Sequence, residues 1–148
     1  MDLPVVTVSS CQNCQPHHFL ESGEVIGEAI RRNDWRVQLL ASGALSHKFN
    51  GIDWKPKHPR IFHESNVSKP EHVESRKRAI ELMAQGRHDT IIEHWDSDYL
   101  CLPWKAFGAH YLQMVGAMGG AACRAKGQTL SDYENARGTG NIHIWFEG

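Results

Sequence analysis

The chain has 148 residues, of which 41% are hydrophobic, and this suffices for one domain (1–148) with a core of ordinary size. Its 16 lysines and arginines nearly balance its 17 aspartates and glutamates, so nothing in the charge points to a nucleic-acid or anionic-membrane partner. The longest mostly apolar stretch is too short for a bilayer, and four cysteines without a secretory signal predict reduced thiols in the cytoplasm.

Two short apolar runs are typical of buried strands. Residues 4–9, PVVTVS, are β-branched or apolar at nearly every position. Residues 37–41 form the second run, which Ser42 and Gly43 end. With a helix between them, the two strands make a β-α-β unit, which predicts an α/β fold with a mostly parallel or mixed central sheet flanked by helices. Because the first strand begins almost at the first residue, we expect a partial domain of a larger fold.

The helix between these strands is predicted over residues 21–32. Ser22 is a suitable cap for its first turn. Four apolar side chains repeat at helical spacing and define the expected buried face: Val25, Ile26, Ala29 and Ile30.

The second half of the chain predicts a long loop, three helices and a strand. Residues 50–69 contain prolines and aromatic side chains, and we expect an ordered lid there. Helices are predicted over 70–85, with Gly86 as its stop, over 89–95 and over 105–119. The first of these is expected to bury Val73, Ile80, Met83 and Ala84 and to expose Glu74, Arg76, Lys77 and Arg78.

The third helix is rich in glycine, and the last strand alternates in polarity. Leu112, Val115 and Met118 are expected in the core, while the glycines at 108, 116, 119 and 120 predict close approach to another backbone. Residues 141–146, NIHIWF, alternate between apolar and polar positions, which predicts a strand with one buried face.

One histidine follows the second predicted strand. His47 lies on the loop at the carboxyl end of 37–41, where open α/β sheets keep their ligands. An imidazole in this position is a candidate acid/base, because it titrates near neutral pH. The alternative is a loop histidine that only caps or hydrogen-bonds.

Other histidines and cysteines allow further interpretations. Cys11, Cys14, His17 and His18 have the side chains that zinc prefers, but their spacing is not that of a known zinc finger, and a loop lining a cleft is the preferred interpretation. His110 lies in the apolar helix, where an ionisable ring needs a partner or a function, although a satisfied core histidine is the more usual outcome. Solvated or hydrogen-bonded rings are expected at His58, His63, His72, His88 and His94.

Together, several of these segments resemble a known family. The runs VVTVSSCQNC, LLASGALSH, FGAHYLQMVGAMGG and GTGNIHIWF are similar to the C-terminal portion of class III extradiol ring-cleaving dioxygenases, the LigB-like superfamily. Its members include the catalytic subunit of protocatechuate 4,5-dioxygenase and one group of homoprotocatechuate 2,3-dioxygenases. The SGALSH segment is the most specific part. The resemblance spans nearly the whole chain but only about half of such an enzyme.

The resemblance implies a specific chemistry. The family holds a non-haem Fe(II) ion with two histidines and a glutamate, which leaves open positions for a catecholic aromatic acid and O2. It implies that His47 is the acid/base that takes a proton from the catechol hydroxyl. It further implies that Ser46, Asn13 and His17 bind the substrate.

The chain departs from the family at the metal. The two iron-binding histidines of the family lie in an N-terminal half that has no counterpart in this sequence. The family's glutamate aligns with His110 or with Lys105, depending on which glycine is used as the anchor. Neither is a carboxylate, and of the two only the imidazole can ligate iron at neutral pH, so His110 is the candidate ligand.

Three interpretations therefore stay open. The first is a fragment or subunit of an extradiol dioxygenase, inactive as an isolated chain, whose iron site is completed by another polypeptide. The second is a metal-free partner subunit or degenerate homologue, which the missing ligands favour. The third is a small zinc-binding interaction module that uses Cys11, Cys14 and His17. A second subunit or self-association is also expected, because an unpaired edge strand invites another strand.

Overall fold

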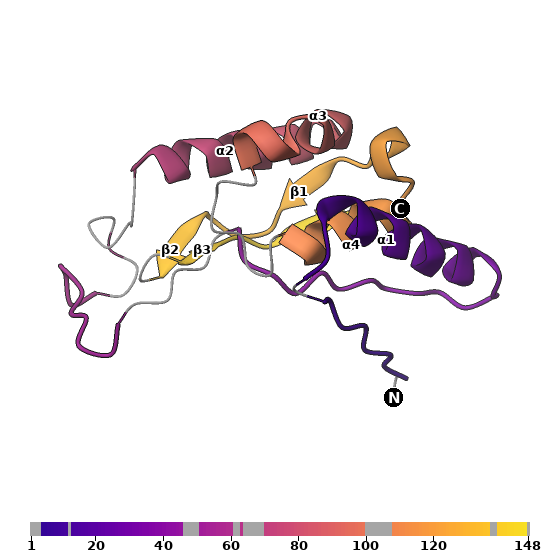
Figure 1. Cartoon of the computed structure of the whole chain (residues 1–148), viewed down its shortest axis with the longest axis horizontal. Coiled ribbons are helices and arrows are strands. Elements are labelled where there is room, and N and C mark those ends of the chain that lie inside the picture. The colour runs from indigo at the N-terminus through magenta and orange to yellow at the C-terminus, as the bar shows by residue number, and fades with distance from the viewer. Residues whose placement is uncertain are drawn as a thin grey trace.

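The computed structural model shows a mainly helical protein with a few short strands (Figure 1). The residues that it describes are 4–11, 13–45, 51–60, 63, 70–99, 108–136 and 139–147. The helical elements are α1 (Pro16–Arg31), α2 (Pro70–Ala84), α3 (His88–Glu93), the π-helical turn η2 (Trp95–Tyr99), α4 (Ala109–Ala117) and the 3-10 turn η4 (Gly120–Ala122). The strands are β1 (Gly127–Thr129), β2 (Glu134–Ala136), β3 (Thr139–Asn141) and β4 (Ile144–Phe146).

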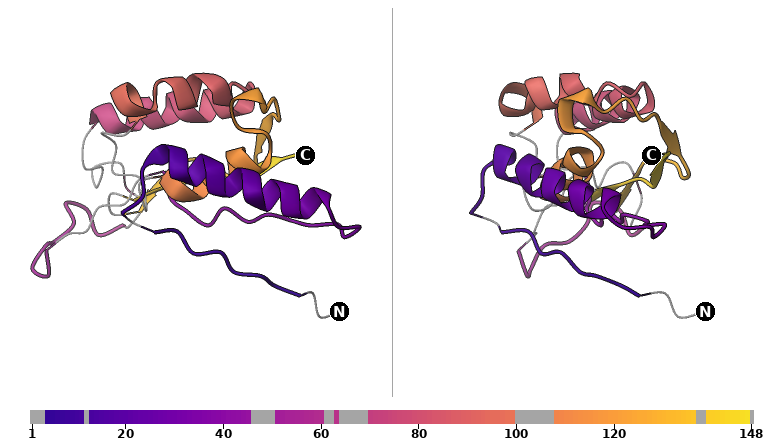
Figure 2. Two further views of the ribbon diagram at one scale, coloured as in Figure 1. Left: turned by 45° about the vertical axis from the view of Figure 1, so that its right-hand side comes forward. Right: turned by 90° about the vertical axis from the view of Figure 1, so that its right-hand side faces the viewer.

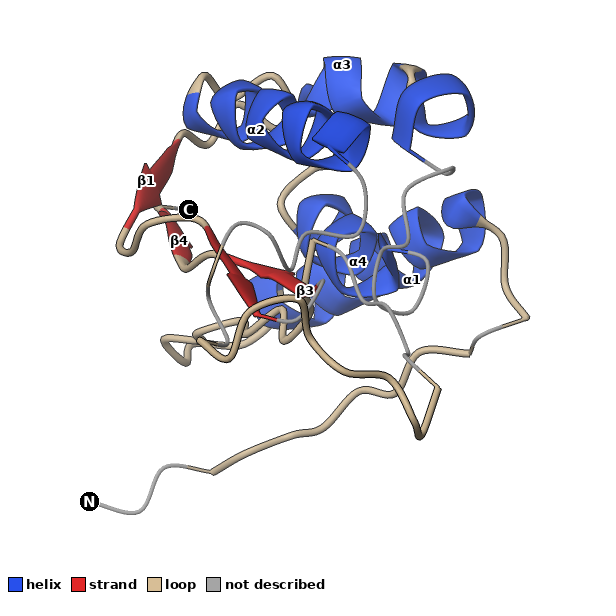
Figure 3. Cartoon of the chain, turned by 90° about the vertical axis from the view of Figure 1, so that its left-hand side faces the viewer, coloured by secondary structure: helices blue, strands red, loops and turns tan. Residues whose placement is uncertain are grey.

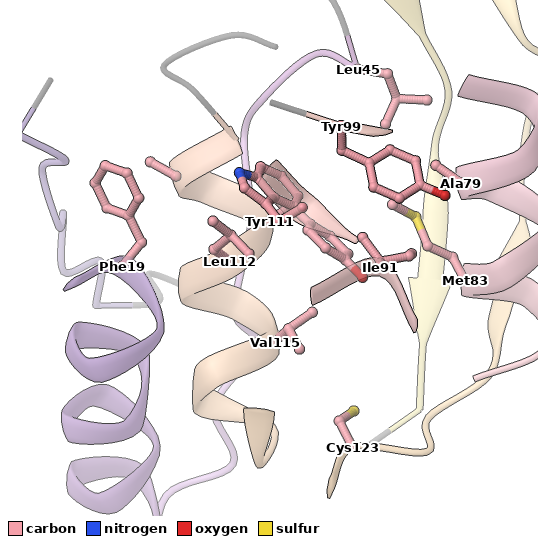
Figure 4. Packing of buried hydrophobic residues seen from close by; sticks show 12 residues of the cluster. Phe19, Leu45, Ala79, Met83, Ile91, Tyr99, Tyr111, Leu112, Val115 and Cys123 are labelled. Atoms are coloured by element: carbon pink, nitrogen blue, oxygen red, sulfur yellow. The ribbon is translucent and has the colours of Figure 1, made fainter. Parts of the chain in front are cut away.

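Helix α4 lies at the centre of the hydrophobic core (Figure 4). One of its sides packs against α1, which contributes Phe19, and its other side faces Ile91 of α3 and Met83 of α2. Leu112 and Val115 are buried on α4, which confirms their prediction as core residues, whereas Met118 is only half-buried. The helix is shorter than predicted, and residues 105–107 of the prediction lie outside the described residues.

Glycines allow α1 and α4 to pack with their backbones almost in contact. A methyl group on Gly116 would collide with the carbonyl oxygen of Leu20, and one on Gly23 would collide with the carbonyl oxygen of Gln113. Gly27 approaches the backbone of Ala117 in the same way. The close approach predicted at Gly116 is therefore confirmed.

Helix α1 differs from its prediction at its start and in its buried face. It begins at Pro16 instead of Glu21, because proline suits the first helical position and the Gln15 N–H donates to His18 Nδ1 at 3.0 Å. Ser22 is thus inside the helix. The prediction of its buried face is wrong, since Val25 is 70% exposed. Phe19, Gly23 and Gly27 are buried instead, because the glycines pack against α4. The other expected core positions were Ile26 and Ile30, which are half-buried, and Ala29, which is exposed.

The predictions for α2 and α3 are largely confirmed. Helix α2 covers Pro70–Ala84 and is stopped by Gly86, whose φ of 70° is one that glycine adopts most readily. Helix α3 begins at His88, one residue before its predicted start. Within α2, Met83 is buried as expected, but Ala84 is exposed, and Arg76, predicted on the wet face, is completely buried.

Residues 4–9 and 37–41 form no strands in the structure, although both were predicted as buried ones. Val5 and Val6 are 82% and 87% exposed, and Leu40 is 77% exposed. Figure 2 shows the N-terminal segment leading away from the helices in both views. A strand needs a neighbour for its backbone hydrogen bonds, and no described segment pairs with either run, so the β-rich sequence alone does not produce a ladder.

The described strands form two antiparallel pairs, β1 with β4 and β2 with β3 (Figure 3). The fold is therefore a mixture of helices and strands, and every ladder among the described residues is antiparallel. The strand predicted over 141–146 is divided, since β3 ends at Asn141 and β4 begins at Ile144. The predicted alternation is confirmed: Ile142, Ile144 and Phe146 are half-buried, whereas His143 and Trp145 are exposed.

None of the described helices combines the length and the apolar character that a bilayer crossing requires. The described parts of the expected lid, 51–60 and residue 63, are loop, in which His58 and His63 stack with ring centroids 3.7 Å apart. Whether this segment covers a site depends on residues outside the described part of the chain, so the lid stays a prediction.

The glycine contact between α1 and α4 predicts a sharp position dependence of stability. Gly116→Val places a branched side chain against the carbonyl of Leu20, which moves only if α1 moves, and we expect a loss of about 2 kcal/mol or more. The free energy of unfolding is measured by chemical denaturation. Gly51→Val is the matched control, because a methyl group there meets nothing within 4 Å. Equal unfolding midpoints for the two variants would contradict the packing argument.

Candidate functional site

The predicted acid/base and one substrate residue, His47 and Ser46, lie outside the described residues. The loop that leads to them is described up to Leu45. That residue is buried, and its N–H donates to the carbonyl oxygen of Gly140 at 3.0 Å. The SGALSH loop is therefore fixed to strand β3, which belongs to the GTGNIHIWF segment singled out from the sequence.

The same loop passes over His110. A methyl group on Gly43 would lie 3.1 Å from Cδ2 of His110, so the loop backbone and the imidazole are in direct contact. His110 is half-buried on the first turn of α4. The structure thus brings together the loop of the predicted acid/base and the predicted metal ligand, although the two are far apart in the sequence.

The N-terminal segment reaches the same helix through a polar chain. Ser10 donates to Oε1 of Gln113 at 2.8 Å, and Nε2 of Gln113 donates to the hydroxyl of Ser22 at 3.2 Å. Gln113 lies one turn after His110, on the same side of α4. The beginning of the chain is therefore attached to the helix that carries the candidate ligand.

The two other predicted substrate residues are exposed. Asn13 lies in a turn before α1, and His17 lies in the first turn of α1, where its ring approaches that of His18 with centroids 3.9 Å apart. No described contact joins either side chain to His110. Their role in substrate binding stays a prediction.

The zinc hypothesis concerns the side chains before and at the start of α1. A hydrogen bond with the Cys11 thiol is the main reason that the pKa of Cys14 is raised. His18 uses Nδ1 to accept the N–H of Gln15. Within the described part of the chain, no three side chains of histidine, cysteine, aspartate or glutamate form a group that could hold a metal ion.

The described residues also do not fit an Fe(II) centre on their own. The iron of the dioxygenase family needs two histidines and a carboxylate on one face of the ion. Among the described residues His110 is a single candidate, and it belongs to no group of three potential ligands. A complete centre would need donors that this part of the chain does not supply.

Sequence reasoning missed the burial of His88. A solvated or hydrogen-bonded ring was expected in polar or helical surroundings; the ring is hydrogen-bonded, but it is also completely buried. Its Nε2 donates to the carbonyl of Ala125 at 2.9 Å, so its Nδ1 accepts the hydroxyl of Tyr111 at 2.8 Å. Burial is the main reason that the pKa of His88 is lowered. His88 is thus a neutral core residue that joins α3, α4 and the segment after η4.

Sequence reasoning also missed the burial of Arg76. The sequence around it is a run of charges, 74–78, which usually marks a solvated face. The helical spacing of Arg76 with Ala79 and Met83, both buried, was the signal that places it inward. Nη1 of Arg76 donates to the hydroxyl of Tyr133 at 3.1 Å.

A shallow depression of about 370 Å³ lies between α2 and η2. It is open and polar, and none of the predicted site residues contributes to it. Its lining consists of Ser75, Arg78, Ser97, Asp98 and Tyr99. The depression therefore does not extend the candidate site at His110.

No family model matches the chain, and no curated protein matches it. The resemblance to extradiol dioxygenases accordingly depends on the motif residues of the sequence alone.

The buried imidazole predicts a loss of stability in acid. The pKa of His88 is lowered in the folded state, so just below the ordinary value of 6.5 the unfolded chain binds a proton that the folded chain does not. The stabilising contribution of His88 to the free energy of unfolding is therefore complete above pH 6.5 and falls as the pH drops below it. We expect the stability advantage of the wild type over His88→Gln to shrink over this range in denaturation measurements. His143→Gln, at an exposed position, serves as the control and should show no such trend. A pH-independent difference for His88→Gln would contradict the prediction.

Proposed function

We propose that the chain is a fragment or subunit of an extradiol ring-cleaving dioxygenase that acts on a catecholic aromatic acid with O2. One observation carries this proposal: the loop that ends in SGALSH contacts His110 through Gly43 and is held by Gly140 through Leu45. Three motif segments that suggest the family from sequence therefore adjoin one another in the fold. A shared site requires such an adjacency.

The chain's contribution to this reaction is proton transfer. His47 would take the proton from a catechol hydroxyl, a step that suits an imidazole because its pKa is normally close to neutral pH. Ser46, Asn13 and His17 would orient the aromatic acid. These roles are carried over from the resemblance, and they stay predictions.

The second polypeptide would supply what the described residues lack. The remaining iron ligands would come from it, with His110 as the ligand offered by this chain. The same partner would supply strands for 4–9 and 37–41, which would then enter the parallel or mixed sheet predicted from the sequence. The exposed valines and leucines of both segments support this role, because such side chains are normally buried in a sheet.

A reducing compartment is consistent with the described cysteines. Cys11, Cys14 and Cys123 are free thiols. Cys123 is buried in the core, where a thiol behaves as a small apolar group. We therefore propose a cytoplasmic location for the assembly.

The second candidate is a metal-free partner subunit. It is favoured by the residues at the family's glutamate position, His110 or Lys105, since neither has a carboxylate. Iron content after anaerobic Fe(II) loading of the assembled protein separates the two candidates. Equimolar zinc retained through purification would instead support the zinc-binding module.

The dioxygenase proposal predicts that the isolated chain is inert. Without the missing iron ligands, the pure chain should open no catechol ring after anaerobic Fe(II) loading and exposure to O2. Formation of the yellow ring-opened product is followed by absorbance, with a known extradiol enzyme as the positive control. Robust turnover by the chain alone would show that the ligand set is complete without a partner.

The acid/base role predicts the effect of one substitution. In an assembly that opens catechol rings, His47→Ala should lower kcat by about 100-fold or more, the usual scale of general acid/base catalysis, without unfolding the chain. The control is His94→Ala, which removes an exposed imidazole at the end of α3, outside the motif segments, and should leave turnover unchanged. Turnover by His47→Ala at the wild-type rate would exclude the role.

A further inference from the structure

A buried positive charge lies outside the candidate dioxygenase site. Arg76 has no exposed surface, and the neighbours on its face of α2, Ala79 and Met83, are 0% and 2% exposed. A guanidinium does not lose its proton in a protein, so the charge persists in this apolar environment. Such a group is stable only when an anion or a full set of hydrogen-bond acceptors compensates it.

The described residues compensate Arg76 only in part. Nη1 donates to the hydroxyl of Tyr133 at 3.1 Å. Nε and Nη2 are buried without an acceptor, and none of the ion pairs between described residues includes Arg76. These two nitrogens form one edge of the planar guanidinium, so two parallel N–H groups lack a partner.

The hydroxyl of Tyr133, which lies at Nη1, adds a further donor near the guanidinium. Its oxygen accepts from Arg76, and its own hydroxyl hydrogen is therefore available to another acceptor. The ring is held against strand β3, because a methyl group on Gly140 would collide with the Tyr133 hydroxyl. The two unpaired N–H groups thus belong to a rigid fork, and the Tyr133 hydroxyl lies at the third nitrogen of the same guanidinium.

We propose that Arg76 and Tyr133 form a binding site for a small organic carboxylate. The Nε and Nη2 edge matches the two oxygens of a carboxylate, which a guanidinium binds through two parallel charge-assisted hydrogen bonds. One guanidinium neutralises one negative charge, so a monocarboxylate fits better than a dianionic phosphate. The site does not depend on iron or on the proposed ring cleavage, and it stands if that function is disproved.

Burial determines how such a ligand binds. Since Arg76 is enclosed, a bound carboxylate is held out of water, where its hydrogen bonds to the guanidinium are strongest. Entry requires a local opening between α2 and the Tyr133 segment, an event of the kind that occurs at the edges of small folds. The bound ligand supplies the acceptors that Nε and Nη2 lack.

Thermal unfolding of the full chain tests this site. Sodium benzoate and sodium acetate, compared with sodium chloride at equal ionic strength, should raise Tm by about 3 °C or more when well above their Kd. Arg76→Met should abolish the rise, while Arg78→Met, on the exposed face of the same helix, should retain it. No rise with either carboxylate, or an equal rise in Arg76→Met, would overturn the proposal. A larger rise with phosphate than with benzoate would overturn the assignment to carboxylates.

A second measurement uses only the wild-type chain, so it does not depend on whether a variant folds. The side-chain Nε–H resonance of Arg76 in the 15N-labelled wild-type chain should shift during titration with benzoate, because its hydrogen gains an acceptor. The corresponding resonance of Arg78 is the internal control and should stay unchanged. An Arg76 signal that does not respond at saturating benzoate would overturn the proposal, whatever the behaviour of the variants.

Discussion

The contact between the backbones of α1 and α4 is the constraint on which the rest of the structure depends. Gly23 and Gly116 allow this contact because a side chain at either position would collide with a carbonyl group of the other helix. With α1 fixed at this short distance, Phe19 covers one side of α4, and the other side is free to face α2 and α3 (Figure 4). A helix as short as α4 gains little stability from its own hydrogen bonds, so tertiary packing holds it in place.

Helix α4 in turn connects the polar features of the molecule. Gln113 links it to the N-terminal segment, Tyr111 links it to His88, and His110 contacts the loop that precedes His47. His110 and Gln113 lie on one side of the helix, one turn apart, and Tyr111 points to another side. A displacement of α4 would therefore affect the candidate site and the buried imidazole together, and this explains why glycine at position 116 matters for more than helix packing.

Features that depend on local sequence could be predicted, and features that depend on distant partners could not. Pro70 and Gly86 delimit α2 through their own backbone preferences, so that helix was predicted closely. The hydrogen-bond partner of Arg76 is Tyr133, which is 57 residues away, and no local pattern reveals this pairing. The inward face of α1 was predicted wrongly because hydrophobic periodicity favours Val25 over a glycine, although close packing selects the glycine. At the candidate site, SGALSH identified a loop that does contact His110, but periodicity and spacing do not give that contact.

Two features of the chain are energetically unfavourable in the folded state. The runs 4–9 and 37–41 have the composition of strands, yet their apolar side chains face water and the described residues provide no ladder for them. Arg76 has the opposite mismatch, since it is a charge in an apolar interior with an edge that the described residues leave without acceptors. Exposed apolar side chains and buried unpaired donors both raise the free energy of the folded state. A neighbouring strand would remove the first mismatch, and the carboxylate proposed above would remove the second, because each would supply the contacts that the described residues lack.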